Sequence, residues 1–352
     1  MSASNYIIGG NDEHGQNPPT ANKRTPIMPY LERSIYENEF NRPAKIYYFI
    51  SLLRSGFNVF DVHPEIYDVP ISTRVSRANN ANITLLVTFA YNAFGSGQSF
   101  NSVSGALTFY SERNVFAERS KELSEDVFLG ITENSLQTKG LGISTLANVG
   151  ILQSVRAPST LAECGFMTNL REARLMLDPA WQKSIAFGAT QGICTYMGEP
   201  YISEGNPNAY PILRRNSRGN YVKILQYYLT IYGYDVNADG IFGINTESAV
   251  KQFQADNGLI ADGIVGRLTW AKLLLTQPSA NVLRRGSRGT SVYYLQMKLL
   301  SKLYPLGNVD SIFGQRTENA VKAFQTESGL TADGIVGPLT WAMINTLDSP
   351  RN

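Results

Sequence analysis

The spacing of apolar residues predicts alternating strands and helices over the first 197 residues. Ile46, Phe49, Ile50 and Leu53 follow the i, i+3, i+4, i+7 spacing of a helix, and Gly56 supplies its stop. Strands are expected at residues 6–10, 57–62, 83–90 and 161–163, and a closing helix at residues 181–196. This alternation predicts an α/β domain with a mixed, mostly parallel sheet and helices on both faces.

The C-terminal part contains an internal repeat. Residues 213–219 read Leu-Arg-Arg-Asn-Ser-Arg-Gly, and residues 283–289 read Leu-Arg-Arg-Gly-Ser-Arg-Gly. Asp-Gly-Ile-Val-Gly also occurs twice, each time shortly before Leu-Thr-Trp. Apolar residues at helical spacing between Asp-Gly turns predict two small all-α modules of three helices each. The expected domains are residues 1–197, a linker at 198–211, and repeats at 212–276 and 282–347.

Composition narrows the classes of protein that are possible. The chain has 352 residues, 43% of them hydrophobic and 17% charged, as in ordinary globular proteins of several domains. A net charge of +2 is too small to indicate nucleic-acid binding. No apolar run reaches the length of a membrane span. The two cysteines, Cys164 and Cys194, have apolar neighbours and are expected to be buried thiols. None of these properties indicates an oligomeric state.

Four residues are candidates for chemistry. His14 follows the first strand, and open α/β sheets place their sites at the carboxyl ends of strands. His63 precedes a proline and is expected to be a plain loop residue. Glu37 begins a long helix, where a favourable interaction with the helix dipole could by itself explain an acidic residue. Glu163 ends a short apolar run, where a carboxylate is costly unless it binds a metal, pairs or does chemistry.

Residues 5–197 resemble the zinc-dependent N-acetylmuramoyl-L-alanine amidases of the type-3 family. His14-Gly15 is similar to the first-ligand motif of that family, and Glu37, four residues before Asn41, is similar to the second ligand. The segment 162–169, Ala-Glu-Cys-Gly-Phe-Met-Thr-Asn, resembles the one that carries the catalytic glutamate, which falls on Glu163. The resemblance also implies that Arg74 and Asn92 contact the substrate. The two C-terminal copies resemble peptidoglycan-binding type-1 modules.

The chain departs from this pattern at the third zinc ligand. The family has a strand that ends in Ser-Ile-His-x-Asn-Ala, whereas residues 88–93 read Thr-Phe-Ala-Tyr-Asn-Ala, with Ala90 in the place of the histidine. Because a methyl group cannot bind zinc, we expect zinc to be weakly bound or absent. Ala90 fits either a designed inactivation of a working enzyme or a natural loss.

The resemblance implies a peptidoglycan hydrolase that cuts the amide between the lactyl group and L-alanine, held on the wall by its repeats and impaired by Ala90. One alternative is a wall-binding pseudoenzyme or structural protein. Another is a glycosidase, in which Glu37 and Glu163 would form the acid pair. Residues 1–5 contain no basic residue, and a strand follows them. We therefore expect synthesis in the bacterial cytoplasm without a signal peptide, and action at the cell wall or spore cortex after lysis or release.

Overall fold

The computed structural model describes residues 2–15, 23–146, 148–205, 207–274 and 282–351, which form two compact units. The first unit extends from the N-terminus to Ser203, except for residues 29–33 and 177–180. The second unit consists of these two short segments and residues 204–352.

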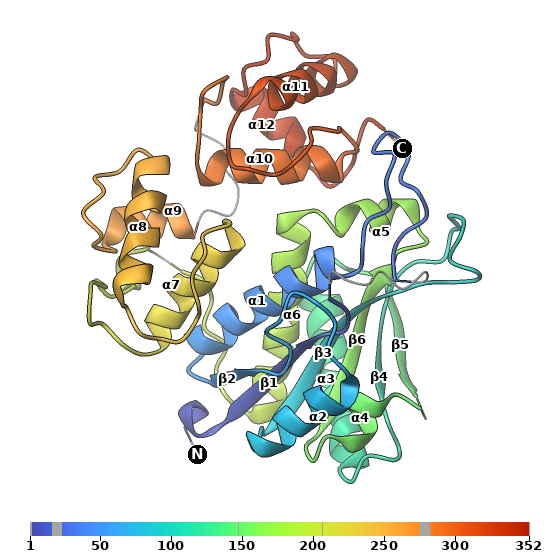
Figure 1. The fold of residues 1–352 in the computed structure, drawn as a ribbon. Helices are drawn as coiled ribbons and strands as arrows, with labels where there is room; N and C mark the ends of the chain where they lie inside the picture. The colour runs from blue at the N-terminus through green and yellow to red at the C-terminus, as the bar shows by residue number, and fades with distance from the viewer. Residues whose placement is uncertain (1, 16–22, 147, 206, 275–281, 352) are drawn as a thin grey trace. The chain divides into compact units, whose positions relative to one another are not determined.

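The first unit is built around a six-stranded sheet with the strand order β2-β1-β3-β6-β4-β5 (Figure 1). Its strands are β1 (Ile7–Asp12), β2 (Asn58–Asp61), β3 (Leu85–Asn92), β4 (Ala106–Tyr110), β5 (Gly140–Thr145) and β6 (Ser159–Phe166). The strands β2, β1, β3 and β6 run parallel, and β4 pairs antiparallel with β6 and parallel with β5. The predicted mixed, mostly parallel sheet is confirmed.

Helices cover both faces of this sheet, as predicted. They are α1 (Asn38–Arg54), α2 (Ile71–Asn80), α3 (Ala117–Asn134), α4 (Gly150–Ser154), α5 (Leu170–Leu175) and α6 (Pro179–Met197), after a short 3-10 helix at Ala3–Asn5. On one face, α2 and α4 pack against an apolar cluster that includes Leu86 and Leu161. On the other face, the ring of Phe89 packs edge-on against Tyr48 of α1, and the Thr160 hydroxyl bonds to Ser124 of α3.

The apolar pattern located some elements better than others. The helix around Ile46 ends where predicted, and Gly56 after it adopts a positive φ of 91°. The strand expected at 161–163 is longer and spans Ser159–Phe166. Strands β4 and β5 were not predicted, because both are short and β5 lies at the sheet edge, mostly exposed and interrupted by Gly142. Helix α3 was not predicted either.

The second unit contains the two repeats, each with three helices as predicted. The first repeat has α7 (Asn220–Ile231), α8 (Ile244–Asp256) and α9 (Arg267–Leu273), after a 3-10 turn at Pro207–Ala209. The second repeat has α10 (Thr290–Ser301), α11 (Gln315–Glu327) and α12 (Pro338–Ile344). Among the helices that the structure describes, none is long and apolar enough to cross a membrane. In the first unit, Cys164 and Cys194 are free and buried, as predicted.

A buried glutamine organises the Asp-Gly turns of the repeats. Gln226 donates from Nε2 to Asp239 Oδ1, Ile241 O and Thr246 Oγ1, and its Oε1 accepts the N–H of Gly240. The same four bonds are centred on Gln254, Gln296 and Gln325. This shared bonding explains why the Asp-Gly motifs recur in the sequence: each turn must present an Asp and a backbone N–H to one glutamine.

One of these turns carries a residue that strains it. The residue after the Asp has a φ of 76° at Gly240 and 61° at Ser311, so the serine keeps the left-handed conformation of the glycine with only a small backbone adjustment. Glycine adopts this conformation freely, whereas the Cβ of other residues makes it costly.

We expect Ser311→Gly to stabilise the second repeat and Gly240→Ser to destabilise the first, each by about 1 kcal/mol, because the side chain at this φ costs conformational energy. Amide hydrogen exchange in α10 and α7 of the full chain would measure the two effects. Unchanged protection in both variants would show that the turn carries no strain.

Candidate functional site

The carboxyl ends of β1, β3 and β6 lie side by side and form the floor of the site. Asp12 pairs in register with Phe89, and the N–H of Glu13 donates to Phe89 O at 3.2 Å, which continues the β1–β3 ladder by one residue. On the other side of β3, Ala90 pairs with Glu163 of β6. Glu13, Ala90 and Glu163 therefore lie at the same level on three neighbouring strands.

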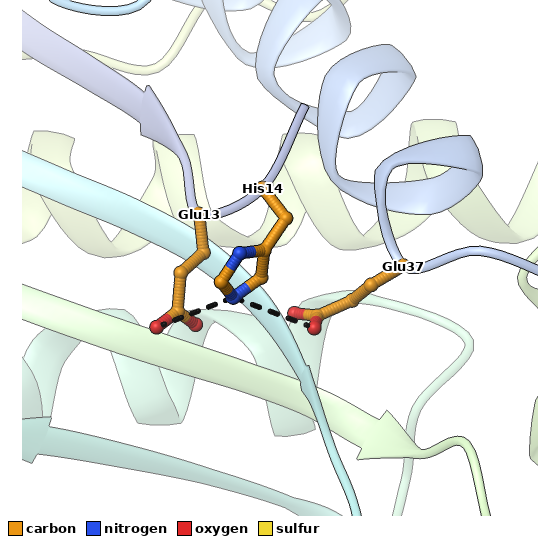
Figure 2. Close-up of side chains that lie close together, drawn as sticks. All are labelled: Glu13, His14 and Glu37. Atoms are coloured by element: carbon orange, nitrogen blue, oxygen red, sulfur yellow. Dashed lines mark ion pairs between the residues drawn. The ribbon is translucent and has the colours of Figure 1, made fainter. Parts of the chain in front are cut away.

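Glu13, His14 and Glu37 form the candidate ligand cluster. His14 Nε2 lies 3.7 Å from Glu13 Oε1 and 3.8 Å from Glu37 Oε2, and one ligand atom from each residue lies within 4.8 Å of the other two. Figure 2 shows the two carboxylates on either side of the imidazole. Glu37 is positioned at the start of α1, where its Oε1 accepts hydrogen bonds from Asn41 Nδ2 and the N–H of Tyr91.

The electrostatics of this cluster favour a bound cation. Burial raises the pKa of Glu37 to about 8, and the Glu13 carboxylate adds to the rise. Burial also raises the pKa of Glu13. The pKa of Glu163 is well above its usual range because of burial and the charges of Glu13 and Glu37. Burial, with the nearby Lys23 ammonium, lowers the pKa of His14 to about 3, which leaves a neutral imidazole. Neutral imidazole and carboxylate oxygens are the forms that bind metals.

The donor set fits a divalent metal ion such as zinc. The buried atom His14 Nε2 has no hydrogen-bond partner, and neither has Glu163 Oε2 beside the cluster. The separations of 3.7 and 3.8 Å are too long for hydrogen bonds. They are close to the distance of about 3.4 Å between two ligands of one tetrahedral zinc ion. Histidine nitrogen and glutamate oxygen are both established zinc ligands.

Helix α2 and the segment before it hold the loop that carries Glu13 and His14. Arg74 is buried and donates through Nη1 to the backbone oxygens of Asp12 and Glu13, both at 2.7 Å. The N–H of Gly15 donates to Asp68 Oδ1, and a Cβ at Gly15 would come within 2.4 Å of the Asp68 backbone nitrogen. Gly15 therefore allows the close approach that fixes the imidazole beside it.

A buried ionic network supports the end of β1. Lys45 Nζ lies 2.8 Å from Asp12 Oδ1 and from Asp61 Oδ1. The ring of His63 is buried, with Nδ1 2.9 Å from Asp12 Oδ1 and Nε2 2.8 Å from Tyr67 O. His63 lies in the loop after β2, as predicted, but its ring is buried and forms part of this network, which the sequence did not indicate. The same contacts leave its nitrogens unavailable to a metal at His14.

The other predicted site residues lie at the same end of the sheet. Ala90 is fully buried in the apolar cluster beneath the site. Asn92 ends β3, and its Oδ1 accepts the N–H of Ala93. The contacts of Arg74 with the β1 loop account for its burial, and its contact with substrate stays a prediction, as does that of Asn92. Glu13 was missed in the sequence, because its position opposite Ala90 depends on the pairing of β1 with β3.

Comparison with known proteins identifies the family. The model of the N-acetylmuramoyl-L-alanine amidase family matches residues 14–195, which contain most of the first unit. The model of a peptidoglycan binding domain matches residues 218–273 and 288–344, one in each repeat. The chain belongs to the N-acetylmuramoyl-L-alanine amidase family, whose members depend on zinc, and carries two peptidoglycan-binding domains.

Individual relatives cover parts of the chain. The N-acetylmuramoyl-L-alanine amidase CwlL of Bacillus licheniformis is 32% identical over 173 residues, which are 41% of this chain and 48% of the relative. A spore cortex-lytic enzyme of Bacillus cereus is 38% identical over 66 residues, 19% of this chain and 26% of the relative. The chain thus spans about half the length of such curated relatives, or less. The CwlD amidase of Clostridioides difficile, solved with the GerS lipoprotein, covers 55% of this chain and 98% of its own at 22% identity and a TM-score of 0.48.

The Lys45 network can be tested through stability. We expect Lys45→Met to lower the free energy of unfolding of the first unit by about 3 kcal/mol, because it removes the buried cation between Asp12 and Asp61 and leaves only Arg42 beside Asp12. Although burial raises the pKa of Asp12, Lys45 and His63 hold it well below the usual aspartate value of 3.8. The stabilisation by Asp12 is therefore complete above that value and is lost as the pH falls, so Lys45→Met should also reduce the loss of stability in acid.

Urea unfolding followed by circular dichroism, at about pH 7 and about pH 3, measures both effects. Lys121→Met, at an exposed position of α3, is the matched control and should unfold like the natural chain. Equal unfolding free energies for the two lysine variants would contradict the role of the network.

Proposed function

We propose that this chain hydrolyses the amide bond between the lactyl group of N-acetylmuramic acid and L-alanine in peptidoglycan. The observation that carries the proposal is the position of Glu163 at the end of β6, beside a cluster of one imidazole and two carboxylates, with Oε2 unpartnered. In a member of the amidase family, this arrangement offers a metal-binding group and an adjacent acid–base group.

The residues would divide the chemistry between them. His14 and Glu37 would hold zinc, which when bound polarises the scissile carbonyl and lowers the pKa of a water molecule. Glu163 would accept a proton from the attacking water and return it to the leaving amine. The raised pKa of Glu163 suits a group that must both take up and release a proton. Asn92 and Arg74 are proposed to contact the substrate at the ends of β3 and α2.

Ala90 lowers the expected activity. An imidazole on β3 at this level would point to the same face as Glu163, and a methyl group provides no ligand there. Loss of even an indirect partner of a metal ligand costs about 10–100-fold in affinity or activity. We therefore propose an amidase whose activity is impaired relative to an otherwise identical chain with a histidine at this position. Ala90 is also the observation that favours the second candidate function, a wall-binding protein without catalysis.

We expect the zinc-loaded chain to release new amino termini from purified peptidoglycan, and Ala90→His to do so at least about 10-fold faster. Glu163→Gln should abolish the release in both backgrounds, because the amide side chain cannot carry the proton. Labelling of free amino groups and of reducing ends in the digest measures the bond that is cut.

Glu112→Gln, at an exposed position between β4 and α3, serves as the matched control and should keep full activity. Reducing ends without new amino termini would identify a glycosidase instead. Zinc-loaded Ala90→His without any amide cleavage would establish the wall-binding protein as the function.

The repeats are proposed to hold the catalytic domain on its insoluble substrate. Both match the peptidoglycan-binding model over most of their length, and both keep the glutamine-centred turns. Attachment through a second site raises the local concentration of substrate at the first.

We expect residues 211–352 alone to co-sediment with purified peptidoglycan and residues 1–197 alone to remain largely in solution. A pelleting assay at equal protein concentration would measure the bound fraction of each. Equal pelleting of the two fragments would refute this division of roles.

A further inference from the structure

The side chain missing at Ala90 leaves a position that is flanked by Glu13. Asn11 Nδ2 donates to Thr88 Oγ1, so these two residues of β1 and β3 point to the same face of the sheet. Because side chains two residues apart on a strand point to the same face, Glu13 and Ala90 lie on the same face as Asn11 and Thr88. Ala90 contributes only a methyl group between Glu13 and Glu163 at this level.

Glu13 directs its carboxylate into the cluster. Its Oε1 lies 3.7 Å from His14 Nε2, nearly as close as Glu37 Oε2 at 3.8 Å. The Glu13 side chain is only 27% exposed, so most of it is turned into the protein and not toward solvent. The Nη1 group of Arg74 fixes the backbone beneath it through the Glu13 oxygen, so the carboxylate starts from a rigid base.

We propose that Glu13 is the third metal ligand of this chain and replaces the imidazole that is missing at Ala90. The inference rests on the proposed function, since it assigns a ligand in the same site. The metal centre would then consist of Glu13, His14 and Glu37, with Glu163 beside it. Two adjacent residues of one loop would supply two of the three ligands.

This ligand set changes the metal preference. Two carboxylates and one imidazole are harder donors than one carboxylate and two imidazoles, and carboxylates favour manganese more than imidazole does. Zinc still binds more tightly than manganese to such donors. The centre should therefore take zinc first and discriminate less against manganese than Ala90→His does.

The charges at the site agree with a bound dication. The carboxylates of Glu13 and Glu37 lie 3.7 and 3.8 Å from His14 Nε2, and Glu163 lies on the strand next to Ala90 at the same level. His14 Nε2, which is buried and has no hydrogen-bond partner, lies between the Glu13 and Glu37 carboxylates and could bind the metal as a neutral ligand. A dication at this place would compensate the carboxylates and give His14 Nε2 a partner.

The test is metal binding by the full chain. Zinc and manganese affinities would be measured by isothermal titration, with metal content after dialysis as a second reading. The sequence alone predicted weak or absent zinc, but with Glu13 as a third ligand we expect one zinc per natural chain. Glu13→Gln should bind zinc at least about 10-fold more weakly, the order of loss expected when a group that supports a metal site is removed. Glu112→Gln is the matched control and should bind like the natural chain. Circular dichroism of each metal-free variant checks that it is folded.

A second variant gives the proposal an independent reading. Ala90→His in the Glu13→Gln background should recover zinc affinity and lose affinity for manganese relative to zinc. Failure of the natural chain to retain zinc, or equal affinities of the natural chain and Glu13→Gln, would overturn the assignment of Glu13.

The amide-cleavage assay separates this inference from the proposed function. Metal binding that depends on Glu13, without amide cleavage by any variant, would refute the function and keep the ligand. Amide cleavage and zinc affinity that are both unchanged in Glu13→Gln would keep the function and refute the ligand.

Discussion

The parallel register of β1, β3 and β6 is the constraint on which the site depends. It places Glu13, Ala90 and Glu163 at one level on three neighbouring strands. A shift of one residue in either ladder would turn one of these side chains to the opposite face of the sheet. Helix α1 adds Glu37 through its bond to the N–H of Tyr91 on the same central strand. The site is thus assembled from three strands by backbone pairing and from α1 by a side-chain hydrogen bond.

The surroundings of the site remain intact around the alanine. Lys45 still neutralises Asp12 at the end of β1, and Arg74 still holds the loop that follows. Burial of these charged side chains costs desolvation free energy. Buried charged groups with shifted pKa values are typical of functional sites. Carboxylates that raise each other's pKa are unfavourable in a folded protein unless a cation joins them. The account that explains both features is a metal centre with a changed ligand.

Much of the fold and part of the site could be predicted from the sequence. The apolar run of β3 and the helical spacing around Ile46 located the central layer, and the duplicated Asp-Gly motifs located the two repeats. His14 and Glu163 were identified from their places at strand ends, Glu37 from its place at the start of a helix, and all three from the family resemblance. The position of Glu13 could not be predicted, because it follows from hydrogen bonds between strands that lie far apart in the sequence. The contacts of His63 were missed for the same reason, since a loop histidine becomes buried only through tertiary packing.

The central claim is that Glu13 completes the metal centre, and the most direct measurement is anomalous diffraction at the zinc edge from crystals of the full chain grown with zinc. The account predicts a single strong peak in this domain, within about 2.2 Å of His14 nitrogen and of oxygens from Glu13 and Glu37. A zinc ion bound by His14 and Glu37 with the Glu13 carboxylate turned to solvent would contradict it. So would the absence of an anomalous peak at these residues.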